Sequence, residues 1–228
     1  MGKVSKKYGY MVSFYEKAVT SNCHKALHFL NQKEVLREFY LAGGTALALQ
    51  VGHRISTDLD WFSSTLHLQK NEREEIILDL NKSGEFEFVS EQDGMLFTRL
   101  FKADVSFIYQ HHPLLEPTIE YQGIQLASPA DIGLMKLAAI NSRGTRRDFV
   151  DIYCLRKIIT LEKLLQLIAK KYADRPTFLA IAARALTYFE DAEQQPMPKM
   201  LISIEWNDVK NYCTTAARQL TRKLSSLE

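Results

Sequence analysis

Two aspartates in the first third of the chain have the type and spacing that phosphate chemistry requires. Asp58 and Asp60 are two residues apart in a segment, 58–62, that alternates as a strand does. Alternate side chains of a strand share one face, so the two carboxylates point the same way. Neighbouring carboxylates repel each other unless a divalent cation lies between them. Oxygen ligands favour Mg²⁺ or Mn²⁺ over zinc, and the pair therefore predicts such a site; a solvated edge face is the alternative.

Two glycines precede the aspartates and could bind an anion. Gly43 and Gly44 follow a short apolar run, 39–42, and precede a segment, 45–51, with helical character. Bare backbone N–H groups and the helix dipole make the start of a helix a site suited to a triphosphate. The same pair could instead form only a tight strand-to-helix turn.

A third carboxylate could complete this site. Asp104 lies in the segment 100–107, which has the apolar flanks of a strand. On a strand next to Asp58 and Asp60 it would make a trio, and three carboxylates around two metals would activate a hydroxyl and stabilise a leaving pyrophosphate. The alternative is a simple salt bridge to Lys102, which shares its face.

These residues resemble a known family. The run GGTALAL…HRISTDLDWF, residues 43–62, looks like the signature of the DNA-polymerase-beta-like nucleotidyltransferases. Its Thr-Ala-Leu after the glycines and its His-Arg-x-Ser before the aspartates are similar to the AbiEii/AbiGii toxins. The resemblance continues through Lys136 and RGTRRDFVDIYCL, residues 143–155, and the last third of the chain matches only in being helical.

The resemblance implies an enzyme that moves NMP from an NTP to an acceptor hydroxyl with release of pyrophosphate. It implies Mg²⁺ or Mn²⁺ at Asp58, Asp60 and Asp104, with Asp104 also able to accept a proton. It assigns the other matching positions to phosphate contacts, to nucleotide binding or to the second motif: Gly43, Gly44, Thr45, Arg54, Ser56, Lys136, Asp148 and Asp151.

The resemblance also implies partners. Toxins of this group are associated with RNA, especially tRNA, or with protein hydroxyls, and they often accompany a cognate antitoxin. The acceptor is therefore predicted to be RNA, with nucleotidylation of a protein partner as the alternative. A catalytically silent nucleotide-binding protein is a further alternative, against which the three intact aspartates argue.

The second motif has plainer interpretations. Lys136 is surrounded by apolar residues and could snorkel from an apolar helix face. Arg143, Arg146 and Arg147 could grip an RNA backbone or form an ordinary charged corner, in which Arg147 pairs with Asp151 one helical turn away.

Composition sets the class of protein. The 228 residues include 46% hydrophobic and 25% charged residues, with a net charge of +2, as in ordinary globular domains. Three widely separated cysteines form no zinc motif and predict a reducing, cytoplasmic location. We expect no signal peptide and no membrane span.

The predicted fold class is α+β: a small mixed sheet flanked by helices, followed by a helical C-terminal region. We expect a nucleotidyltransferase core over 1–125 and a helical region over 126–228 that completes the cleft. An Asp-Gly turn predicts a hairpin between 86–89 and a long run, 95–109, that could be bent or split. Helices are predicted over 10–31, 45–51, 71–80, 130–141, 147–157, 161–172, 177–189 and 208–224.

Overall fold

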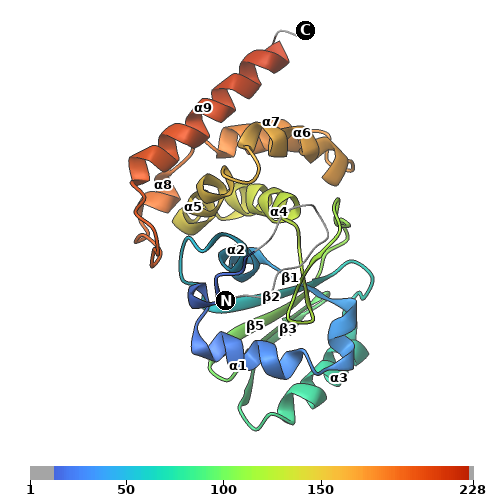
Figure 1. The fold of residues 1–228 in the computed structure, drawn as a ribbon. Coiled ribbons are helices and arrows are strands. Elements are labelled where there is room, and N and C mark those ends of the chain that lie inside the picture. Colours follow the sequence, from blue (N-terminus) through green and yellow to red (C-terminus); the bar gives the residue numbers. More distant parts are fainter. Residues whose placement is uncertain (1–12, 226–228) are drawn as a thin grey trace. The chain divides into compact units, whose positions relative to one another are not determined.

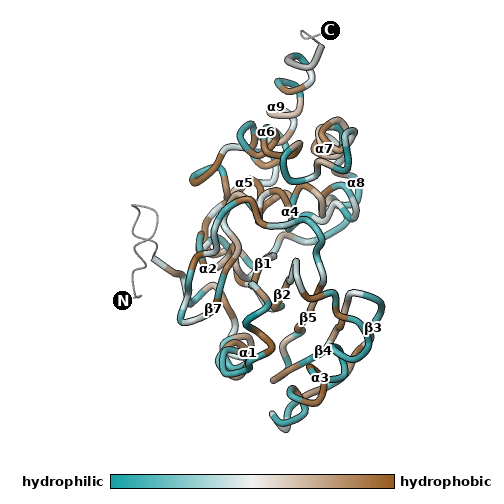
Figure 2. The backbone as a smooth tube through the Cα atoms, turned by 90° about the vertical axis from the view of Figure 1, so that its right-hand side faces the viewer, coloured by the Kyte–Doolittle hydropathy of each residue, from teal (hydrophilic) through white to brown (hydrophobic). Residues whose placement is uncertain are grey.

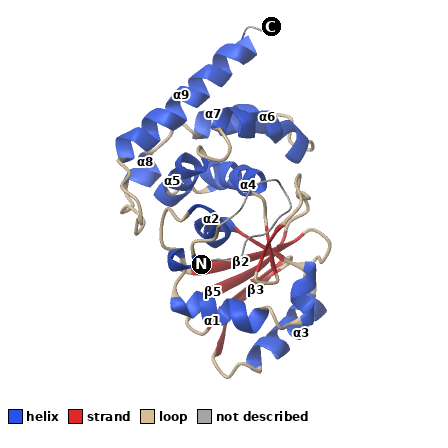
Figure 3. Cartoon of the chain, viewed as in Figure 1, coloured by secondary structure: helices blue, strands red, loops and turns tan. Residues whose placement is uncertain are grey.

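The computed structural model describes residues 13–225, which form two compact units. Unit 1 comprises residues 13–113 and 117–128, and unit 2 comprises residues 114–116 and 129–225. The strands all belong to unit 1, whereas unit 2 is helical (Figure 3). The α+β class predicted from the sequence is confirmed.

Unit 1 is built on a mixed sheet with the strand order β3-β4-β5-β2-β1-β7-β6. The β2–β5 and β1–β7 pairs are parallel, and the other pairs are antiparallel. The strands are β1 (Tyr40–Ala42), β2 (Asp58–Ser63), β3 (Phe86–Gln92), β4 (Met95–Leu100), β5 (Ala103–Tyr109), β6 (Ile119–Tyr121) and β7 (Ile124–Leu126).

The long run 95–109 is split into two strands. Phe101 and Lys102 have φ angles of 50° and 64°, and they form the tight turn that reverses the chain between β4 and β5. The hairpin predicted at Asp93-Gly94 joins β3 to β4, with Gln92 opposite Met95. This double reversal places β5, and Asp104 with it, next to β2.

Helices lie on both faces of this sheet. Figure 1 shows α1 (Ser21–Leu30) and α3 (Lys70–Asn81) on one side and α2 (Gly43–Val51) on the other. Figure 2 shows α1 mostly in the hydrophilic colour and α3 in both colours; the buried positions follow helical spacing, as at Ala26 and Leu30 of α1 and at Ile76 and Leu80 of α3. Trp61 and Phe107 are among the largest fully buried side chains of the core.

The first predicted helix, 10–31, is wrong in its extent. Residues 10–12 lie outside the described part, residues 13–15 are irregular, and Glu16–Ala18 is only a 3-10 turn. Val19 is extended and forms a bridge with Ser56, so the chain cannot be helical there. Helix α1 begins only after Thr20, whose side chain accepts a hydrogen bond from the Cys23 N–H. A second 3-10 helix, Glu34–Glu38, was not predicted.

Unit 2 consists of helices. They are α4 (Pro129–Ser142), α5 (Arg146–Leu155), α6 (Leu161–Lys171), α7 (Phe178–Ala185), α8 (Glu190–Glu193) and α9 (Trp206–Ser225). The helix predicted over 177–189 is shorter than expected and is followed by the short α8. Within the described range, no helix is both long and apolar enough to cross a membrane.

A buried ion pair ties the small segment 114–116 to the helices of unit 2. The Asp131 carboxylate accepts hydrogen bonds from the backbone N–H groups of Leu115 and Glu116, and Lys171 lies 2.7 Å from its Oδ1. Both side chains are almost fully buried. Because each charge has a partner, the pair can remain in the core.

Candidate functional site

The parallel pairing of β2 and β5 brings the three predicted carboxylates together. Asp58 is the register partner of Asp104, and Asp60 is the register partner of Ser106. Register partners and alternate residues share a face of the sheet. Asp58, Asp60 and Asp104 therefore form one group, which we call the carboxylate row, and the buried Leu59 alternates with it on the other face.

Hydroxyl groups orient two of these aspartates. The Ser56 hydroxyl donates to Asp58 Oδ1 at 3.1 Å, and the Ser106 hydroxyl donates to Asp60 Oδ1 at 2.6 Å. The Thr45 hydroxyl donates to the backbone carbonyl of Asp58 and so ties β2 to the first turn of α2. The side chains of Asp58 and Asp60 are thus held by serines just before β2 and on β5, and the backbone of β2 is held by α2.

Asp104 is held by a residue that the sequence analysis did not select. Arg99 Nε donates to Asp104 Oδ1 at 3.0 Å, so the partner in the structure is Arg99 and not the Lys102 of the alternative interpretation. Arg99 faces Asp104 across the tight β4–β5 turn. That register would have followed from reading 95–109 as two strands.

Gly43 begins α2 directly against the carboxylate row. Its φ of +63° lies in the left-handed region that favours glycine. A Cβ at this position would lie 2.5 Å from Asp60 Oδ2, far inside van der Waals contact. A glycine is therefore needed both for the backbone conformation and for the close approach of the helix start to Asp60.

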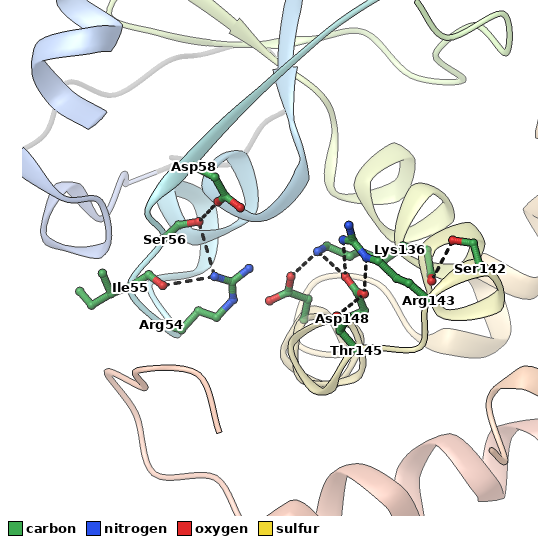
Figure 4. A network of polar contacts seen from close by, with 11 residues as sticks. Arg54, Ile55, Ser56, Asp58, Lys136, Ser142, Arg143, Thr145 and Asp148 are labelled. Atoms are coloured by element: carbon green, nitrogen blue, oxygen red, sulfur yellow. Dashed lines mark hydrogen bonds and ion pairs between the residues drawn. The ribbon is translucent and has the colours of Figure 1, made fainter. Parts of the chain in front are cut away.

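Arg54 is buried beside Gly44. Its guanidinium Nη1 donates to the Ile55 carbonyl at 3.2 Å and lies 3.5 Å from Ser56 Oγ (Figure 4). A Cβ on Gly44 would lie 2.4 Å from Arg54 Nη2. The predicted nucleotide-binding positions Gly44, Arg54 and Ser56 are consequently in contact with one another.

A buried thiol lies in the field of the row. Burial raises the pKa of Cys23, and the charges of Asp58 and Asp104 raise it further. Grouped carboxylates such as those of the row attract cations.

The predicted residues of the second motif lie together in unit 2. Lys136 Nζ lies 2.9 Å from Asp148 Oδ1 and 2.7 Å from Asp151 Oδ2. Arg143 donates to both carboxylate oxygens of Asp148, and the Thr145 hydroxyl donates to Oδ2 alone (Figure 4). Lys136 is buried and bound to carboxylates, so the snorkelling interpretation is wrong.

Opposing effects set the pKa of Asp148. Burial alone would raise it, but the positive charge of Lys136 and the hydrogen bonds from Arg143 lower it to about 2 from the ordinary 3.8. Asp148 is therefore ionised at neutral pH and holds the start of α5 against α4.

Two arginines of the basic corner have partners inside the protein. Arg143 binds Asp148, and Arg146 donates to the carbonyl oxygens of Ala192 and Glu193 while its guanidinium lies over the Trp206 ring. These contacts favour the plainer of the two interpretations, a structural corner, for Arg143 and Arg146.

A cavity of about 360 Å³ lies elsewhere in unit 1, lined in part by residues 31–34, Trp61 and residues 123–125. Trp61 alternates with Asp60 along β2 and so points to the opposite face of the sheet. The cavity is therefore not part of the carboxylate row.

The fold of this chain is similar to that of a solved nucleotidyltransferase. Among solved structures, the nucleotidyltransferase toxin MenT4 from Mycobacterium tuberculosis is similar, with 17% identity, a TM-score of 0.51, and 89% of this chain and 86% of that chain covered. JHP933 from Helicobacter pylori matches with 18% identity and a TM-score of 0.48, over 94% of this chain and 96% of that one.

The family itself is defined by sequence. The model described as nucleotidyl transferase AbiEii toxin, type IV toxin–antitoxin system, matches residues 28–221, and the chain belongs to this family. An uncharacterized protein from Aquifex aeolicus, aq_aa25, is 32% identical over 182 residues, which are 78% of this chain and 85% of the relative. The family resemblance predicted from residues 43–62 is confirmed, and it supports nucleotidyl transfer as the general class of activity.

Proposed function

We propose that this protein transfers NMP from an NTP to an acceptor hydroxyl in a reaction that depends on Mg²⁺ or Mn²⁺. The observation that carries the proposal is the carboxylate row on β2 and β5, with the glycine start of α2 packed against Asp60. Anion-binding N–H groups next to cation-binding carboxylates make a site suited to a metal-bound triphosphate.

The chemistry of the row fits a hard divalent cation. Its donors are carboxylate oxygens, two of which are already oriented by serine hydroxyls. Asp58, Asp60 and Asp104 would hold the ion. When bound, it would neutralise charge on the phosphates and on the leaving pyrophosphate.

The residues of the chain have distinct tasks in this proposal. The backbone of Gly43 and Gly44 binds phosphate oxygens, and Thr45, Arg54 and Ser56 support that contact. A bond forms between the acceptor oxygen and the α-phosphorus, and the bond from the α-phosphorus to the bridging oxygen breaks. Pyrophosphate leaves with that oxygen, and the proton of the acceptor hydroxyl passes to Asp104.

The proposed acceptor is RNA, in particular tRNA, and the proposed setting is a toxin with a cognate antitoxin. The family description, a toxin of a toxin–antitoxin system, supports the setting. Nucleotidylation of a protein is the competing outcome, and the labelling experiment described next distinguishes an RNA acceptor from a protein acceptor.

The test is the transfer of label from each α-³²P-labelled NTP, with Mg²⁺, to total cellular RNA or protein. Asp60→Ala removes one carboxylate of the row, and exposed Glu75→Ala on α3 is the matched control. Metal ions supply several kcal/mol to such reactions, and about 1.4 kcal/mol is tenfold in rate. We expect Asp60→Ala to lose at least about 10³-fold in rate and Glu75→Ala to keep the full rate.

Digestion of the product identifies the acceptor. Label that is released by RNase and resists protease supports RNA, whereas the reverse result assigns a protein acceptor. Full transfer by Asp60→Ala would end the assignment of the row as the active site. Binding of NTP without transfer to either pool would indicate a catalytically silent protein.

A further inference from the structure

The row of carboxylates belongs to a longer charged row that crosses four strands. Glu87 on β3 is the register partner of Arg99 on β4, Arg99 of Asp104 on β5, and Asp104 of Asp58 on β2. These four positions carry the charges −, +, − and − in spatial order. Arg99 is the cation of that row, and it stands at the end of the carboxylate trio.

Arg99 holds two carboxylates at once. Its Nε donates to Asp104 Oδ1 at 3.0 Å, and its Nη1 donates to Glu87 Oε2 at 3.1 Å. Glu87 thus fixes the guanidinium from the far side, and the planar guanidinium transmits that orientation to Asp104. Within the trio, each aspartate then has a donor on its Oδ1: Ser56 for Asp58, Ser106 for Asp60 and Arg99 for Asp104.

Asp104 depends on such a donor more than the other two aspartates do. Its side chain is 67% exposed, whereas Asp58 and Asp60 are half-buried. An exposed carboxylate samples several rotamers unless a contact fixes it. Partners that orient ligands to a metal commonly change its affinity when they are removed.

We propose that Arg99, braced by Glu87, is a positioning residue that fixes Asp104 for cation binding in the carboxylate row. The inference rests on the proposed function, because it assumes that the row holds a divalent cation. The inference predicts whether loss of Arg99 strengthens or weakens cation binding. A positive charge next to a cation site weakens binding by repulsion, so loss of Arg99 would strengthen binding if charge alone mattered and weaken it if orientation dominates.

The test measures Mn²⁺ binding to the full chain without nucleotide, by electron paramagnetic resonance of the free ion. The variants are Arg99→Ala, Arg99→Gln and Glu87→Gln. Lys102→Asn is the control, because it removes a positive charge from the same turn and asparagine tolerates the left-handed φ of 64°. Arg99 is 44% exposed, and exposed ion pairs contribute little to stability, so we expect the variants to fold.

We expect Arg99→Ala to weaken Mn²⁺ binding about 10-fold. Arg99→Gln keeps a donor without the charge and should recover part of that loss, while Glu87→Gln should show a smaller loss and Lys102→Asn none. Tighter binding by both Arg99→Ala and Arg99→Gln, or unchanged binding by all, would overturn the proposal. Failure of the proposed function is a separate result: wild-type protein would bind no Mn²⁺, or Asp60→Ala would bind it as wild type does.

Discussion

Replacing Gly43 by alanine tests whether the start of α2 must touch the carboxylate row. A non-glycine residue in the left-handed region is less stable by about 1–2 kcal/mol, and Gly43 has a φ of +63°. For a domain of this size, that corresponds to a loss of about 2–8 °C in Tm. The new Cβ would also lie 2.5 Å from Asp60 Oδ2 and 3.3 Å from Asp60 Cβ, so the carboxylate must move.

That movement predicts a loss of activity beyond the loss of stability. Asp60 Oδ1 accepts a hydrogen bond of 2.6 Å from Ser106, which a displaced carboxylate cannot keep unchanged. A shift of about 1 Å in a reacting group can lower a rate by about 10²-fold. We therefore expect Gly43→Ala to lower the transfer rate about 100-fold, measured with labelled NTP well below its Tm.

The other end of the same helix provides the matched control. Gly52 ends α2 with a φ of +68°, and a Cβ there would lie 2.3 Å from the Tyr15 ring rather than against an aspartate. Gly52→Ala should lose at least as much stability as Gly43→Ala and keep most of the transfer rate. Equal rates for the two variants at matched fractions of folded protein would refute the reasoning.

Two further predictions concern unit 2. The pKa of Asp148 is about 2 in the folded protein, against an ordinary 3.8. This lowered pKa means that the ionised carboxylate stabilises the fold by about 2 kcal/mol above pH 4. The contribution is lost as pH falls through the folded pKa, and about half of it is gone near pH 3. Urea unfolding of wild type and Asp148→Asn from pH 6 to 2.5 should show a difference in the free energy of unfolding that shrinks with acid, and a constant difference would contradict the assignment. A Cβ on Gly133 would lie 2.7 Å from the buried Leu164 Cδ1, and overpacking of this kind typically costs about 1–3 kcal/mol. Gly133→Ala should therefore lower Tm in the wild-type background and raise it in a Leu164→Ala background, where the added methyl has room and alanine favours the helix; a lower Tm in both backgrounds would count against this packing.

The sequence could predict those parts of the candidate site that depend on local residue patterns. The alternation around Asp58 and Asp60 and the glycines before α2 each depend on neighbours within a few residues. The strand containing Asp104 was also predicted, because apolar residues flank it. The alternation of polar and apolar residues does not show which strand pairs with which. The β2–β5 register is therefore known only from the structure.

The elements that sequence missed depend on distant contacts. β6 and β7 have three residues each, too few to show alternation, and β7 is fixed by its parallel pairing with β1. Val19 and Thr20 lie within a run of helical spacing, yet Val19 pairs with Ser56 and interrupts it. The pairing of Arg99 with Asp104 was not predicted, because the pattern of 95–109 indicates that the run could be split but not where the turn lies.

The contacts of Lys136 bear on what its motif does. Lys136 Nζ has three N–H donors and lies 2.9 and 2.7 Å from two carboxylates, so a phosphate contact would have to use the third donor or replace one of these partners. Breaking a buried pair by removing one partner costs about 3–5 kcal/mol, because the remaining charge stays buried. Lys136 and Arg143 together balance Asp148 and Asp151, and their bonds join α4 and the residue just after it to the first two turns of α5. The geometry therefore favours Lys136 and Asp148 as the link between two helices, and the phosphate contact of Lys136 stays a prediction.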